Sequence, residues 1–141
     1  MVDEEHERPA GVTDQTVAAL GKASEALEWV ERARGHLYEF HQIIGRADIL
    51  FGDAADALDG AGHTKLAELL RKDVLGRNVL HGRWSFQVLE EFEELYYNPI
   101  RVAEDEMRCE LVGGRRHIFE SEMKEQRRTK GAPGHESRPT E

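Results

Sequence analysis

The stretch LYEFHQIIGRADILFGDAADAL, residues 37–58, decides the fold class of this chain. Its inward positions recur at alternating steps of four and three residues, which is the heptad spacing of a helix that packs along its length against other helices. We call these positions the seam. They are Leu37, His41, Ile44, Asp48, Phe51, Ala55 and Leu58.

Two seam positions are ionisable, and such groups on a buried stripe cost stability unless partners satisfy them. One interpretation makes His41 and Asp48 metal ligands or an acid–base pair, with Glu90, Glu91 or His81 brought beside them by folding. The cofactor that this interpretation requires is a divalent metal. The other interpretation is structural: Asp48 pairs with an arginine of a facing helix, and His41 bonds to a carbonyl group.

Helical spacing continues from the seam towards the N-terminus of the chain. Thr13 or Asp14 can cap the first turn, because their side-chain oxygens accept from its free N–H groups. Gly60 and Gly62 suit the end of the helix. An unbroken helix between these limits has about 45 residues and a length of roughly 68 Å.

Three glycines lie inside this predicted helix. Gly35 could divide it into two, because glycine weakens a helix interior by about 1 kcal/mol relative to alanine. Gly45 and Gly52 could instead mark close approaches to another helix. Whether the segment is one helix or two is therefore open.

Three further helices follow the long one. Residues 64–75 form a short helix, residues 86–107 form a long helix that Pro99 interrupts, and residues 115–128 form a last amphipathic helix. No segment alternates at period two, so no strand is expected. The predicted fold is all-α: an up-down helical bundle built on one long N-terminal helix.

The domain organisation follows from these elements. We expect a disordered tail at 1–12, a single helical-bundle domain at 13–128 and a flexible polar tail at 129–141. The long helix has more apolar stripe than its short partners can cover. We therefore predict a homo-oligomer, most simply a homodimer, that associates through the seam at 37–58.

Composition excludes several classes of protein. The net charge of −9 argues against a general nucleic-acid binder. No window approaches the roughly 20 apolar residues of a membrane span, and the acidic N-terminus is not a secretory signal. Cys109 is the only cysteine, so an intramolecular disulfide is excluded. We expect a soluble cytoplasmic protein.

Charge is unevenly distributed near the C-terminus. Residues 90–110 contain eight acidic and two basic side chains, whereas residues 115–130 contain six basic and three acidic ones. The two segments can pair within one chain or between subunits, or they can form two solvated faces.

Two HxxE units offer an imidazole and a carboxylate at i, i+3 spacing, from which one helix face can bind one metal. They are His36 to Glu39 and His117 to Glu120. Di-iron helical bundles use the reverse order, ExxH, together with further glutamates, and ExxH does not occur here. We interpret both units as coincidence.

The run Glu90-Glu91-Phe92-Glu93-Glu94 resembles the acidic EExxE element with which all-α nucleotide pyrophosphohydrolases hold Mg²⁺. That family also needs a second ExxD helix, which is missing here, so we interpret the run as a solvated face. Nucleotide-binding, zinc-protease and serine-hydrolase motifs are absent as well. We therefore predict no catalytic residues and favour a non-enzymatic protein.

The segment GRNVLHGRWS, residues 76–85, concentrates groups that bind anions. Arg77, His81 and Arg83 offer donors, Trp84 offers an aromatic face, and Ser85 could cap the helix that follows. A small acidic ligand or a partner's carboxylate would fit this set. The alternative is a structural loop whose tryptophan packs and whose arginines pair with acidic residues.

The segments GRNVLHGRWSFQVLEEFEELYY (76–97) and GGRRHIFESEMKEQRR (113–128), with GHE at 134–136, resemble a family of small uncharacterised prokaryotic helical proteins. The resemblance covers roughly residues 36–136. It implies a soluble prokaryotic protein with a stereotyped helical core, and it carries no activity, cofactor or partner.

The function that these observations favour is a non-enzymatic helical interaction domain that acts as a homodimer. Two alternatives remain. One is a metal-binding bundle built on His41 and Asp48, and the other is small-anion binding at the 76–86 loop.

Overall fold

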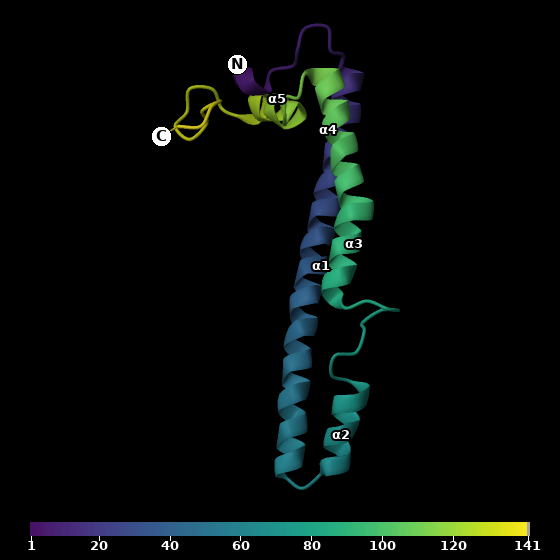
Figure 1. Cartoon of the computed structure of the whole chain (residues 1–141). Coiled ribbons are helices and arrows are strands. Elements are labelled where there is room, and N and C mark those ends of the chain that lie inside the picture. Colours follow the sequence, from purple (N-terminus) through teal and green to yellow (C-terminus); the bar gives the residue numbers. More distant parts are fainter. Residues whose placement is uncertain (141) are drawn as a thin grey trace. The chain divides into compact units, whose positions relative to one another are not determined.

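The protein is all-α, as the heptad spacing predicted (Figure 1). The computed structural model describes residues 1–140, and over these residues it contains no strand, only an isolated bridge between Leu80 and Arg83. The elements in chain order are η1 (Glu4–His6), α1 (Asp14–Gly60), α2 (Thr64–Asp73), α3 (Ser85–Phe92), the π-helical segment η2 (Glu93–Tyr97), α4 (Asn98–Val112) and α5 (Ile118–Arg127).

Helix α1 is a single helix of 47 residues, so Gly35 does not divide it. Thr13 caps its start, where the Oγ1 atom accepts from the N–H of Thr16 at 3.1 Å. Gly62 ends it with a positive φ of 86°, and the N–H of His63 bonds back to the carbonyl of Leu58 at 2.8 Å. This combination is the Schellman motif, in which glycine adopts the left-handed conformation at no steric cost.

The contacts divide the chain into two compact units. The continuous unit contains Val30–Asn98, and the terminal unit contains Met1–Trp29 together with the chain from Pro99 onward. Helix α1 contributes its C-terminal part to the first and its N-terminal part to the second. No helix of the described chain is long and apolar enough to cross a membrane.

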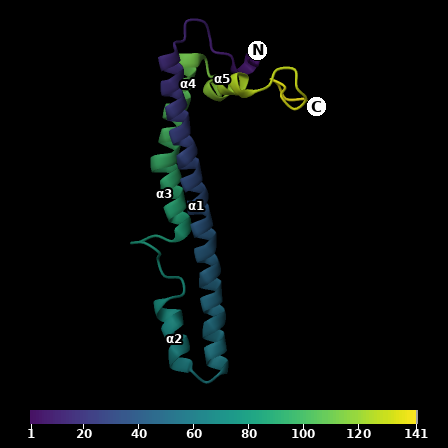
Figure 2. The same cartoon turned by 180° about the vertical axis from the view of Figure 1, so that it is seen from behind.

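In the continuous unit, α2 lies antiparallel beside α1, as both views show (Figures 1 and 2). Ala55 of α1 and Ala67 of α2 are both fully buried. A Cβ added to Gly52 would lie 3.9 Å from Leu75, which is ordinary contact, whereas nothing lies within 4 Å of the same point at Gly45. Leu75 lies after the end of α2, so the contact at Gly52 does not confirm the predicted close approach to another helix, and the prediction is wrong for Gly45.

The predicted interruption at Pro99 is a π-helical segment, and the helix does not end there. The helical residues run without a gap from Ser85 to Val112, and the N–H of Asn98 bonds to the carbonyl of Glu93. Proline removes a backbone donor from the ladder, and π-helical turns occur mostly as single local segments inside α-helices, as here. Around this segment, Arg34 donates to Glu93 at 2.5 Å and lies over the ring of Tyr97, 4.3 Å from its centroid.

The terminal unit has its own small core, in which Val17, Leu20, Val112 and Ile118 are buried together. Both views place α4 beside the N-terminal part of α1 in this unit (Figures 1 and 2). Next to the core, the guanidinium of Arg108 donates to Glu104 at 3.3 Å, to Asp105 at 2.7 Å and to the carbonyl of Gly114 at 2.7 Å. Ser24 completes the network by donating to Glu104 at 3.1 Å.

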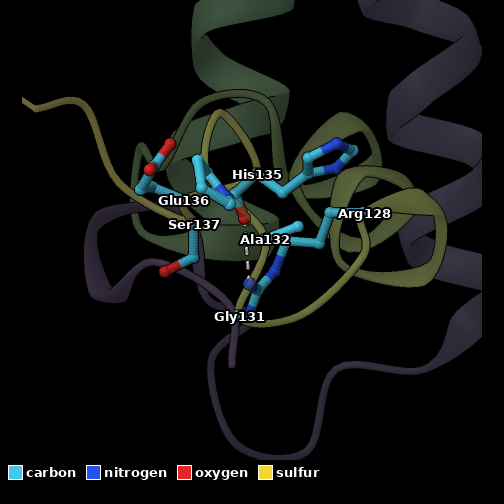
Figure 3. A pocket seen from close by; sticks show the side chains of 7 residues that line it. Arg128, Gly131, Ala132, His135, Glu136 and Ser137 are labelled. Carbon is cyan, nitrogen blue, oxygen red and sulfur yellow. Dashed lines mark hydrogen bonds between the residues drawn. The ribbon is translucent and has the colours of Figure 1, made fainter.

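Specific bonds also hold the two terminal segments. Arg8 donates to Glu122 at 2.8 and 2.9 Å, and Arg128 donates to the carbonyl of His135 at 3.0 Å. The chain after α5 curls over Arg128 around a shallow open hollow (Figure 3). The disorder expected for 1–12 and the flexibility expected for 129–141 stay predictions.

Candidate functional site

The first candidate ligand, His41, is bonded to a serine of the 76–85 loop. Its Nδ1 atom lies 2.8 Å from the hydroxyl of Ser85, which is buried with 7% of its surface exposed. Ser85 is the first residue of α3, and its side chain makes no capping bond to the helix. The expectation that Ser85 caps this helix is therefore wrong: Gln87 instead accepts from the N–H of Trp84 at 2.8 Å.

The second candidate, Asp48, is bonded to the start of the same loop. Its Oδ1 atom accepts from the N–H of Gly76 at 3.1 Å, so it binds a backbone amide and not the arginine that the structural interpretation named. The carbonyl of Gly76 in turn accepts from Trp84 Nε1 at 2.9 Å. Asp48 and His41 are seven residues apart, two turns along one face of α1, and both fasten this loop to the helix.

The four residues of the predicted metal site are not gathered around one point. In residues 1–140, one group of three His, Cys, Asp or Glu side chains brings its ligand atoms within 4.8 Å of one another, and it contains none of the four. Glu91 forms a two-bond ion pair with Arg83, which keeps the pKa of Arg83 above its usual range. Glu90 is exposed.

The anion-binding residues of the loop already have partners within the chain. Arg83 is paired with Glu91 and also donates to the carbonyl of His81 at 3.1 Å. Arg77 points back to the carbonyl of Asp73, at 3.4 Å. The Trp84 ring packs edge-on against Phe86, with 6.4 Å between ring centroids. An anion would have to displace these contacts, so the geometry favours the structural interpretation of this loop.

The seam itself faces the rest of its own unit. Ala55 is fully buried, and His41 and Asp48 bind the loop. The seam is therefore occupied within the chain over most of its length, although Phe51 remains 44% exposed. A dimer interface within 37–58 stays a prediction, although the seam positions that bind the loop already have partners inside the chain.

A second heptad stripe of α1 is more open: four of its six members are exposed, and Ala47 and Ala54 are partly buried. We call it the outer stripe: Phe40, Ile43, Ala47, Leu50, Ala54 and Ala57. Each member precedes a seam position by one residue, a rotation of about 100° around the helix axis. Ile43 is 60% exposed and Leu50 is 53% exposed.

Helix α2 adds two leucines to the same side. Leu66 and Leu69 are 50% and 51% exposed, and each precedes an inward residue of α2, Ala67 or Leu70. Viewed from one end of an antiparallel pair, the chain advances clockwise in one helix and counter-clockwise in the other. The residue that precedes an inward position therefore lies on the same side of the pair in both helices. The outer stripe and these leucines thus form one apolar face.

The opposite side of the helix pair carries charge. Arg71 follows the inward Leu70 by one residue, and it pairs with Asp56 at 2.9 Å and with Asp59 at 2.6 Å. Both aspartates likewise follow inward residues of α1 by one. These ion pairs agree with the assignment of sides: one side is apolar, and the other carries the ion pairs together with the exposed Ile49. Sequence reasoning did not identify the outer stripe. Half of its residues are alanines, and each one is adjacent to a seam position.

No protein-family model, no curated protein and no solved structure matches this chain. The resemblance to a prokaryotic helical family therefore stays a prediction, and function has to be argued from the geometry.

Proposed function

We propose that this protein is a non-enzymatic helical interaction domain that acts as a homodimer. Two copies associate through the apolar face formed by the outer stripe of α1 with Leu66 and Leu69 of α2. The observation that carries the proposal is the exposure of heptad-spaced apolar side chains on one side of an antiparallel helix pair, while the other side is charged.

The heptad spacing favours a helical partner. Apolar side chains at steps of three and four residues fit between those of another helix with the same repeat. Contiguous exposed apolar surface of this kind is uncommon on monomeric proteins and marks contact sites. Two helix pairs placed face to face would bury it in a four-helix arrangement.

A second copy of the chain suits this face better than a charged partner. The chain carries a net charge of −9, so two copies repel each other over most of their surfaces. The stripe positions are all apolar, so association there brings no carboxylates face to face. A two-fold axis would also place each apolar side chain against the same patch of its partner.

The experiment is sedimentation equilibrium or light scattering over a wide range of protein concentration. We expect wild-type protein at twice the chain mass. Ile43→Glu and Leu50→Glu should each weaken the dimer at least about tenfold, because a two-fold interface contains the introduced charge twice.

Ile49→Glu is the matched control. Ile49 has nearly the same exposure as Ile43, 62% against 60%, but it follows the seam residue Asp48 and so lies on the other side of α1. This variant should leave the mass unchanged. A wild-type monomer at every concentration, or equal dissociation by Ile49→Glu and Ile43→Glu, would refute the proposal.

A further inference from the structure

The terminal unit brings three ligand-bearing side chains together that the sequence keeps far apart. Glu28 of α1 meets His117 and Glu120 at the start of α5, and their ligand atoms all lie within 4.8 Å of one another. His117 Nδ1 is 3.9 Å from Glu120 Oε1. All three side chains are exposed, and in the described chain no ion pair engages the Glu28 carboxylate.

Packing fixes the place where these groups meet. Ile118, next to His117, is buried in the core of the terminal unit. Phe119 lies over Gly21, where an added Cβ would be 3.5 Å from its ring and Cβ atoms. Gly21 and Glu28 are seven residues apart, so they share one face of α1. The two contacts therefore hold the first turn of α5 against the face of α1 that carries Glu28.

The orientation of His117 leaves its ring free. His117 precedes α5 in the left-handed conformation, with φ of 55°, and its side chain makes no capping bond. The ring has the weak contact to Glu120 and lies 6.4 Å, centroid to centroid, from His6. Its side chain is 59% exposed, so the ring is accessible to an incoming ion.

We propose that Glu28, His117 and Glu120 bind a divalent transition-metal ion, with water completing its coordination. One imidazole with two carboxylates is a donor set that suits Zn²⁺, Mn²⁺ or Fe²⁺, whereas Ca²⁺ and Mg²⁺ prefer oxygen alone. Two carboxylates supply a charge of −2 that matches the ion. Ligand atoms on one zinc ion are about 3–4 Å apart, so small rotations of exposed glutamates would close the present spacing.

The second HxxE unit provides an internal comparison. His36 and Glu39 have nearly the same spacing, 3.8 Å between Nδ1 and Oε2, and both are exposed. No third ligand joins this pair within residues 1–140. We therefore expect metal binding at His117 and Glu120, which have Glu28 as a third ligand, and no metal binding at His36 and Glu39.

The test is calorimetric titration of the full, metal-free chain with Zn²⁺ at about pH 7.5. We expect one ion per chain with micromolar affinity. Glu28→Gln and His117→Ala should each weaken binding at least about tenfold. Loss of a residue that only orients a metal ligand already lowers metal affinity by about that factor, and loss of the ligand itself should lower it no less. His36→Ala and Glu39→Gln are the matched controls and should bind as wild type.

A second readout locates the ion. Trp29 adjoins Glu28, so Co²⁺ should quench the fluorescence of Trp29 in a Trp84→Phe variant, and Glu28→Gln should abolish the quenching at the same concentration. Absence of Zn²⁺ binding, or binding that survives Glu28→Gln and falls with His36→Ala, would overturn the proposal. The residues differ from those of the dimer face, so either proposal can fail without the other.

Discussion

His41 Nδ1 and Ser85 Oγ lie 2.8 Å apart, and this bond joins the middle of α1 to the first residue of α3. It gives the half-buried imidazole a partner inside the chain, which an ionisable group on a packed stripe needs. Together with the bond from Gly76 to Asp48, it explains why the seam contains two polar residues. Both side chains hold a loop in place.

Ser85→Ala should lower the free energy of unfolding by about 1 kcal/mol, since it removes one hydrogen bond and leaves the His41 ring without its partner. Urea denaturation followed by circular dichroism measures this. Ser137→Ala, in the exposed C-terminal segment, serves as the control. Equal stability of Ser85→Ala and wild type would show that the bond contributes nothing.

Asp48→Ala should open the 76–85 loop to protease. The substitution takes the acceptor from the Gly76 N–H, so trypsin should cut faster at Arg77 and Arg83 than in wild type. Asp48→Asn keeps an acceptor oxygen and should resemble wild type. If Asp48→Asn were cut as fast as Asp48→Ala, the carboxylate charge would matter more than the bond.

Gly45→Ala and Gly76→Ala should change stability in opposite directions. Gly45 is in the interior of α1 with open space around it, so alanine should raise the free energy of unfolding by about 0.5–1 kcal/mol. Gly76 has a φ of 70°, where alanine is strained by about 1–2 kcal/mol. Thermal melting of both variants checks this, and a stabilised Gly76→Ala would contradict it.

Arg108→Ala should be among the most destabilising substitutions in the terminal unit. It strands the buried Glu104 carboxylate, and breaking a buried pair from one side costs about 3–5 kcal/mol. Arg101→Ala, on the exposed surface of the same helix, should stay within about 0.5 kcal/mol of wild type. Chemical denaturation of the two variants distinguishes these outcomes.

Glu125 should titrate far below an ordinary glutamate. Hydrogen bonds from Arg128 lower the pKa of Glu125 to about 2 from 4.5. Because the folded pKa is depressed, the stabilising contribution is complete above pH 4.5 and is lost as the pH falls towards 2. An NMR titration of the carboxyl carbon measures the midpoint, which Arg128→Gln should raise. A wild-type midpoint near the ordinary value would refute the assignment.

The sequence predicted what depends on local periodicity. The end of α1 near Gly60 and Gly62 and the inward direction of His41 and Asp48 follow from spacing along one helix, whereas spacing left open whether Gly35 divides it. The partners of these two residues do not, because Ser85 and Gly76 belong to a loop whose path is set by tertiary packing. Periodicity therefore predicts that Asp48 faces inward, but it does not predict whether the partner of Asp48 is an arginine or a backbone amide.

The candidate metal cluster shows the same limit more strongly. His117 and Glu120 are visible as an i, i+3 pair, but an identical spacing at His36 and Glu39 lacks a third ligand. The burial of Ile118 and the contact between Gly21 and Phe119 distinguish the two pairs, because they bring Glu28 to the first pair. Gly21 is the feature of the sequence that could have indicated this contact. A glycine in a helix can mark a close neighbour but does not identify it.

The composition of the terminal unit has a consequence for synthesis of the chain. Val17 and Leu20 complete their core only with Val112 and Ile118, whereas the continuous unit is encoded in one uninterrupted stretch. At about 5–20 residues per second, the ribosome needs roughly 5–20 seconds between making the two sets of residues. During that interval the first turns of α1 lack the core partners of Val17 and Leu20, so the terminal unit can complete its core only after the continuous unit has been made.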